Sequence, residues 1–284
     1  MRSPPAAAAI GAALHKACRL DVVAFKPGNV SLCSPGHGMQ AQDFLLSAQR
    51  AVPALCVTGR SVGERILSAV RATVAAVGCN TNLGIVLLLA PIAAAAARGG
   101  DFKAALHAVL GELDHEDTAH CYAAIRLANP AGLGRADEGD VHEPPAHDLL
   151  SAMQLAATRD SIARQYATVY NDLFACGVPV LVRQRSRWHS LAWATTACYL
   201  AFLARWPDSH VARKHGPEVA GALCIKAAEV AKALEACENP RSFAEALLAF
   251  DSELKTRGVN PGTSADLTVA SVAILLLQER FPSE

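Results

Sequence analysis

The chain has 284 residues, of which 52% are hydrophobic, so it is long enough to bury a large core without disulfides or metal clips. Lysine plus arginine and aspartate plus glutamate both number 26, and the net charge of zero argues against a nucleic-acid binder that works through overall charge. The nine cysteines form no C-x-x-C pair, which favours small buried side chains in a reduced compartment and predicts a cytoplasmic protein.

Helical periodicity runs along most of the chain, whereas strand alternation never persists beyond a few residues. The segments expected to form helices are 6–24, 42–52, 61–77, 83–97, 102–113, 117–128, 149–174, 188–205, 217–237, 242–256 and 267–280. No period of 20–50 residues repeats, which argues against a solenoid. The sequence therefore predicts an all-α fold, a bundle of about ten helices in a single domain over residues 1–284.

The first helix is broken by Lys26-Pro27-Gly28-Asn29-Val30, and a loop rich in glycine and proline continues to Met39. Proline fixes the backbone and glycine allows positive φ, so this loop is expected to be rigid and to approach a ligand closely. Lys26, Asn29 and His37 are its candidate ligand-binding residues, and Asp43 follows at the start of the next helix. A surface lysine, a loop histidine and a first-turn acid are the structural alternatives.

Residues 78–91 join a polar cluster, Asn80-Thr81-Asn82, to an apolar run. Asparagine and threonine accept backbone hydrogen bonds at a helix start, and the free N–H groups and helix dipole at such a start attract anions. The alternative is a capped core helix with no ligand. The apolar run from Leu83 to Ala97 contains Pro91 and is shorter than the roughly 20 residues of a membrane span, so a buried helix is favoured.

Three later loops combine glycine or proline with charged residues: 129–145, 208–216 and 258–266. Polyphosphate binding needs cations and often a metal held by carboxylates, which these loops and the 26–39 loop contain. A solvated basic face and helix-capping aspartates are the alternatives. Asp160 is also expected to pair with Arg164 four residues later on one long helix. The chain has no Walker A sequence, no G-x-S-x-G and no H-E-x-x-H.

These motifs occur in a fixed order that resembles the triphosphoribosyl-dephospho-CoA synthase family, over roughly residues 10–280. The matching segments are Lys26 to Val30, His37 with Met39 and Asp43-Phe44, Gly78 to Gly84, Gly132-Leu133-Gly134, Asp140-Val141, Arg159 to Tyr166, Asp208 to Lys214, and Asn260 to Leu267. The resemblance implies an all-helical enzyme that joins ATP to 3′-dephospho-CoA. Adenine leaves C1′ of the ATP ribose, the 2′-hydroxyl of dephospho-CoA attacks that carbon, and the triphosphate stays on the product.

The resemblance and the physical requirements of this reaction assign roles to the candidates. Asp140 is expected to be the base or the carboxylate near C1′, with Asp160 as a second catalytic carboxylate. Asp43, Asp208 and Asp266 are expected to hold Mg²⁺. Phosphate, ribose or coenzyme contacts are expected from Lys26, Asn29, His37, Asn80, Thr81, Asn82, Arg126, His210, Arg213, Lys214, Asn260 and Thr263. The expected partners are small-molecule nucleotide and coenzyme substrates, with no nucleic acid and no membrane, and a homodimer is left open.

The chain departs from the family pattern at Gly38 and Ser31, where an acid is common, and at Asn82-Leu83, where a polar stretch is common. This pattern resembles a divergent branch found with one-carbon coenzyme pathways. Two alternatives therefore stand beside the synthase: a related nucleotide-using transferase that makes another coenzyme, and a non-catalytic nucleotide-binding helical protein. Turnover of ATP to free adenine separates the synthase from both.

Overall fold

The computed structural model describes residues 7–282 and confirms the all-α prediction. The α-helices in this range are α1 (Ala7–Val23), α2 (Ala41–Leu55), α3 (Val62–Val77), α4 (Leu83–Arg98), α5 (Phe102–Gly111), α6 (His115–Ala128), α7 (Leu149–Ala156), α8 (Ser161–Ala167), α9 (Val178–Trp188), α10 (Leu191–Arg205), α11 (Ser209–His215), α12 (Pro217–Ala236), α13 (Ala244–Thr256) and α14 (Gly262–Arg280). A π-helical turn, Leu173–Gly177, and a 3₁₀ turn, Pro240–Phe243, complete the helical elements. The described residues form no β-strand, and their β-type pairing is limited to two isolated bridges.

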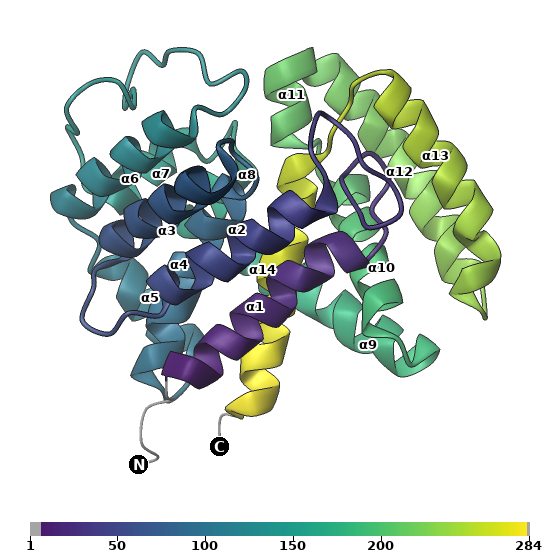
Figure 1. The fold of residues 1–284 in the computed structure, drawn as a ribbon, viewed down its shortest axis with the longest axis horizontal. Helices are drawn as coiled ribbons and strands as arrows, with labels where there is room; N and C mark the ends of the chain where they lie inside the picture. Colours follow the sequence, from purple (N-terminus) through teal and green to yellow (C-terminus); the bar gives the residue numbers. More distant parts are fainter. Residues whose placement is uncertain (1–6, 283–284) are drawn as a thin grey trace.

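Helix α14 runs through the middle of the molecule, with α2 to α8 on one side and α9 to α13 on the other (Figure 1). It packs against α1, α4 and α10. From Thr263 to Leu277, every residue of α14 except Asp266 is buried. A helix that is apolar nearly all round is stable only inside protein, so α14 forms the axis of the core. Asp266, the partly exposed residue within this buried stretch, faces a cavity.

Helix α4 is buried in the way that its sequence predicts. Twelve of its residues, from Leu83 to Ala96, are buried. No single helix among residues 7–282 is both long and apolar enough to span a membrane; α4 and α5 pass that test only as a pair bent by 117°. The apolar run is accounted for by burial against α14, α5 and α3.

The single long helix predicted over residues 149–174 is wrong. Asp160 accepts hydrogen bonds from the backbone N–H groups of Ile162 and Ala163, so a new helix, α8, begins there instead. Val169 and Tyr170 then take positive φ angles of 52° and 58°, which end α8. The predicted Asp160–Arg164 pair is also wrong, because Arg164 Nε donates to Asp172 Oδ2 at 2.8 Å.

Two other segments that read as loops are helical. Residues 209–215 form α11, whose first turn is capped by Asp208, and α14 begins at Gly262 instead of residue 267. Asp266 therefore lies inside the first turns of α14 and not in the loop before it. Both changes move polar side chains onto rigid helix starts next to the core.

Candidate active site

A cavity of about 1090 Å³ lies where the starts of α4, α8, α11 and α14 meet. Its walls include Asp21 of α1, the loop between α1 and α2, the end of α3 and the α6–α7 loop, residues 129–148. The predicted site residues that line it are Asn29, His37, Asn80, Thr81, Asn82, Asp140, Asp160, His210, Arg213, Lys214, Asn260, Thr263 and Asp266. Residues up to 237 positions apart in sequence thus line one cavity.

The start of α4 forms one wall of the cavity. Asn80 Oδ1 accepts a hydrogen bond from the backbone N–H of Leu83 at 3.1 Å, so Asn80 provides the side-chain cap. Asn82 instead accepts from the Thr73 hydroxyl, and Thr81 pairs with the Ser47 hydroxyl. The polar cluster therefore fixes the position of this helix start, and the next residues of α4 face the cavity.

Asp266 is the carboxylate closest to the start of α4. A Cβ atom built on Gly84 would lie 2.0 Å from Asp266 Oδ2, so only glycine leaves room for this carboxylate. No hydrogen bond or ion pair holds the carboxylate within the part of the chain that the structure describes. Burial, together with the negative charges of Asp21 and Asp208, raises its pKa well above the ordinary value.

Lys26 and Asp21 lie beneath this wall as a buried ion pair. The Lys26 side chain is fully buried, and its Nζ donates to Asp21 Oδ1 at 2.7 Å and to the Asp21 backbone carbonyl. Lys26 does not line the cavity, whereas Asp21 does. The positive charge of Lys26 opposes the rise in the Asp266 pKa. Lys26 therefore acts on the site through its neighbours.

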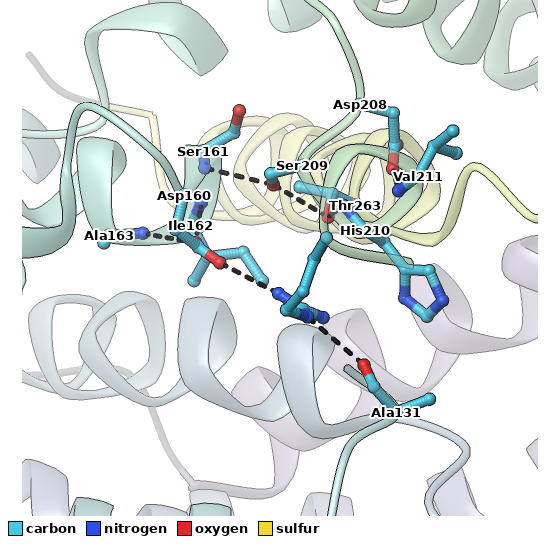
Figure 2. Close-up of polar contacts among 11 residues, drawn as sticks. Ala131, Asp160, Ser161, Ile162, Ala163, Asp208, Ser209, His210, Val211 and Thr263 are labelled. Atoms are coloured by element: carbon cyan, nitrogen blue, oxygen red, sulfur yellow. Dashed lines mark hydrogen bonds and ion pairs between the residues drawn. The ribbon is translucent and has the colours of Figure 1, made fainter. Parts of the chain in front are cut away.

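Asp160, at the start of α8, connects three segments of the cavity wall (Figure 2). One carboxylate oxygen accepts from the N–H groups of Ile162 and Ala163, at 2.8 and 3.1 Å. The other oxygen lies 3.5 Å from Arg213 Nη1. Arg213 Nε also donates to the Ala131 carbonyl at 3.3 Å. Asp160 and the 129–148 loop thus hold the guanidinium at the cavity.

Thr263 joins the starts of α11 and α14. Its hydroxyl oxygen accepts from the Ser209 hydroxyl at 3.1 Å and from the His210 backbone N–H at 3.2 Å (Figure 2). Burial and the nearby cations of Arg213 and Lys214 lower the pKa of His210 to about 4. His210 is therefore neutral at pH 7 and contributes hydrogen bonds rather than charge, while Arg213 and Lys214 carry the positive charge.

The 129–148 loop brings Asp140 to the cavity. Asp140 Oδ2 accepts from the Ala136 N–H at 2.9 Å and Oδ1 from the His142 N–H at 2.8 Å. These bonds lower the pKa of Asp140, which makes it a weaker base than an ordinary aspartate. Tyr122 donates to the Gly139 carbonyl, and Arg126 to the Val141 carbonyl. Arg126 thus braces the loop and does not line the cavity.

Two predicted metal ligands also lie off the cavity. Asp43 accepts from the Gln40 N–H and caps α2. Asp208 is buried and accepts from the Ser264 N–H and hydroxyl, so it ties α11 to α14. Both carboxylates are occupied by helix starts, which argues against the predicted Mg²⁺ role. No group of three or more histidine, cysteine, aspartate or glutamate side chains among residues 7–282 is arranged to hold a metal ion.

Sequence reasoning missed Asp21 and Gly84. Asp21 is a charged residue on the buried face of α1, three residues after Cys18, and that break in an apolar face is the signal that points to it. Gly84 is one of the motif glycines, but its role depends on α14 lying beside α4. Only the tertiary structure reveals that close approach.

These features define a class, an all-helical protein with a cavity of nucleotide size at helix starts, whose lining includes both cationic and anionic side chains. Within that class the chain belongs to the CitG family, ATP:dephospho-CoA triphosphoribosyl transferase, whose model matches residues 7–284. It is similar to a crystal structure from Archaeoglobus fulgidus that is described, provisionally, as a triphosphoribosyl-dephospho-CoA synthase. The two are 27% identical, with a TM-score of 0.64 over 84% of this chain and 99% of the other. No curated protein matches the chain in sequence.

Proposed function

We propose that this protein transfers the triphosphoribosyl group of ATP to 3′-dephospho-CoA and releases adenine. Membership of the family supports the reaction class. The observation that carries the proposal is the pairing, in one cavity, of the Arg213 and Lys214 cations with the unpaired carboxylate of Asp266. The cations can bind a triphosphate. The carboxylate can accept the proton of a hydroxyl that attacks a sugar carbon.

Arg213 and Lys214 bind the triphosphate. Arginine and lysine make charge-assisted hydrogen bonds to phosphate oxygens, each worth roughly 1.5–3 kcal/mol. The start of α4, a long helix that lines the cavity, adds backbone N–H groups and the positive end of its dipole. Because His210 is neutral at pH 7, the positive charge that faces the phosphates comes from Arg213 and Lys214.

Asp266 acts on the reacting centre as the general base. The C1′–N9 bond to adenine breaks, a bond forms between C1′ and the 2′-oxygen of dephospho-CoA, and the hydroxyl proton passes to Asp266. That proton, or one exchanged for it, leaves on adenine. A carboxyl whose pKa is raised toward neutrality accepts a proton more effectively than an ordinary aspartate does. Burial raises the pKa of Asp266 in this direction.

Asp140 and Asp160 take supporting parts in this proposal. The backbone hydrogen bonds that lower the pKa of Asp140 keep it anionic, so it stabilises positive charge that develops on the ribose. Asp160 orients the Arg213 guanidinium. Because the described side chains build no three-ligand metal site, any Mg²⁺ would enter as part of the ATP complex, and no step is assigned to it.

The first test measures ATP binding by calorimetry and adenine release by chromatography. Arg213→Ala should weaken ATP binding by about tenfold or more, since the loss of one charged contact is worth about 1.4 kcal/mol or more. Arg241→Ala is the control, because Arg241 is exposed on the 3₁₀ turn and does not line the cavity. Equal ATP affinity in the two variants would remove the phosphate role of Arg213.

The second test separates the two carboxylates. Asp266→Asn should lower adenine release about a hundredfold while ATP affinity changes little, because a general base contributes roughly 10²- to 10⁴-fold. Asp140→Asn should retain more of the rate. If Asp140→Asn loses the rate and Asp266→Asn does not, the base is Asp140. Absence of adenine release from the wild-type protein with dephospho-CoA present would overturn the synthase reading.

The acceptor is the part of the proposal for which the sequence offers an alternative. Ser31, Gly38 and Asn82-Leu83 differ from the residues common in the family, and Asn82 lines the cavity. A related acceptor that offers a hydroxyl would fit the same chemistry. Adenine release that depends on another hydroxyl-bearing coenzyme precursor, and not on dephospho-CoA, would identify that branch.

A further inference from the structure

Another buried carboxylate, Asp251 of α13, lies outside the cavity and is 4% exposed. Its Oδ1 accepts from the Gly28 backbone N–H at 2.7 Å, and its Oδ2 accepts from the Ser34 hydroxyl at 2.5 Å. Lys255, one turn later, lies 3.1 Å from the same carboxylate and donates to the Ser34 carbonyl. Helix α13 thus holds the 26–39 loop at two points.

The 26–39 loop is also packed tightly against its neighbours at Gly28 and Gly36. Gly28 has a φ of 82°, and a Cβ atom there would lie 2.8 Å from Leu254 Cδ1 and 2.9 Å from Pro261 Cδ. The Lys255 side chain covers Gly36 in the same way. The Tyr199 hydroxyl donates to the Pro27 carbonyl from the core side. The loop therefore has one defined position, which α13 and α10 determine.

This position brings Asn29 and His37 to the cavity. Asn29 is 5% exposed, and its Nδ2 donates to Asn260 Oδ1 at 3.0 Å. Its own Oδ1 has no hydrogen-bond partner among the described residues. A buried acceptor without a donor costs free energy, so this oxygen of a cavity-lining residue is suited to a donor on a ligand that occupies the cavity.

We propose that Asp251 is a positioning residue for substrate binding: it fixes the 26–39 loop so that Asn29 Oδ1 accepts a hydrogen bond from a hydroxyl or amino group of the bound nucleotide. This inference rests on the proposed function for the identity of the ligand. Asp251 itself touches no substrate and acts through Gly28 and Ser34. His37, whose Nε2 bonds to the Gly28 carbonyl at 2.8 Å, moves with the same loop.

The chain contains a matched control in Asp117. This carboxylate is also 4% exposed, and it accepts from the Gly63 backbone N–H and the Ser61 hydroxyl, both at 2.6 Å, and from the Asp114 backbone N–H at 3.3 Å. It joins α6 to the start of α3 and does not line the cavity. Asp117→Asn therefore neutralises a carboxylate of equal burial without touching the 26–39 loop; Asp251 differs in also pairing with Lys255.

Hydrogen exchange measured without any ligand tests the positioning. Asp251→Asn should speed exchange of the Gly28 amide and its loop neighbours about tenfold, since charge-assisted bonds become neutral ones. Asp117→Asn should speed exchange near Gly63 instead. Ser34→Ala, which removes the hydroxyl bonded to Asp251 and Lys255 and keeps Asp251, serves if Asp251→Asn fails to fold. Unchanged exchange across residues 28–39 would overturn the inference whether or not ATP binds.

Calorimetry with ATP tests the role of Asn29. Asn29→Ala and Asp251→Asn should each weaken ATP binding about three- to tenfold, and the double variant should bind no more weakly than Asn29→Ala alone. Asp117→Asn should bind as wild type does. Additive losses would show that Asp251 does not act through Asn29. A wild-type protein that binds no ATP would overturn the proposed function and the ligand role of Asn29, while exchange would still decide the role of Asp251.

Discussion

At the scale of single residues, the site depends on a glycine, Gly84, beside the Asp266 carboxylate. Gly84 stands where α4 passes Asp266, and an added methyl group would lie 2.0 Å from Asp266 Oδ2 and 2.8 Å from Ile162 Cδ1. Gly84→Ala should therefore displace the carboxylate and lower adenine release at least tenfold. Overpacking of this kind also costs about 1–3 kcal/mol of stability, which thermal melting measures.

Gly221→Ala provides the comparison for that variant. Gly221 lies within α12, and a Cβ atom there would meet nothing within 4 Å. Alanine favours a helix over glycine by about 0.5–1 kcal/mol, so this variant should melt at a slightly higher temperature and keep full activity. If Gly84→Ala behaves like Gly221→Ala, the close approach of α4 to Asp266 has no functional weight.

At the scale of elements, Asp160 has two duties that substitution can separate. One oxygen caps α8 and the other faces Arg213. Asp160→Asn keeps a capping oxygen and removes the charge, so it should preserve the melting temperature and weaken ATP binding by loosening Arg213. Asp160→Ala also loses the cap and should cost about 1 kcal/mol of stability in denaturant titrations. Equal stability of the two variants would contradict the capping role.

The same residue explains where sequence reasoning about the elements failed. Periodicity predicted α1 to α6 closely, because Ser61, Asn80 and Asp114 cap helices whose apolar faces are clear. Residues 149–174 kept an apolar period through two real breaks. The turn at Val169 and Tyr170 carries no glycine, and buried packing, with the Tyr170 hydroxyl bonded to the Leu88 carbonyl, holds its positive φ angles. Tertiary contacts of that kind leave no local signal.

At the scale of the whole molecule, the motif loops contain most of the residues that line the cavity, but the sequence could not show that Lys26, Asp43, Arg126 and Asp208 lie off it. Lys26 and Asp208 occur in motifs, yet the fold buries both: Lys26 pairs with Asp21, and Asp208 accepts hydrogen bonds from Ser264. A linear sequence cannot show this, since a motif lysine reads the same whether it touches phosphate or aspartate. The buried carboxylates Asp21 and Asp208 matter through their distance from Asp266, which only the packing of α1, α11 and α14 sets.

That packing places negative charges together in the core, and it should leave a pH-dependent mark on stability. The pKa of Asp266 is raised in the folded protein above its ordinary value of 3.8, through burial first and then Asp21 and Asp208. Between these two pKa values the folded state binds a proton that the unfolded state has released. Stability therefore falls as pH rises above about 4, until the folded pKa is passed.

Asp266→Asn removes this effect because the amide does not titrate. We expect wild type and variant to melt at similar temperatures near pH 4, and the variant to melt progressively higher toward pH 8, by a few degrees, since about 1 kcal/mol shifts Tm by roughly 2–4 °C in proteins of comparable size. The gain should accompany the loss of adenine release, because a site that holds a carboxylate out of water sacrifices stability for reactivity. A difference in Tm that is constant from pH 4 to pH 8 would show that Asp266 titrates as it does in the unfolded chain, and would remove the reason for choosing it as the base.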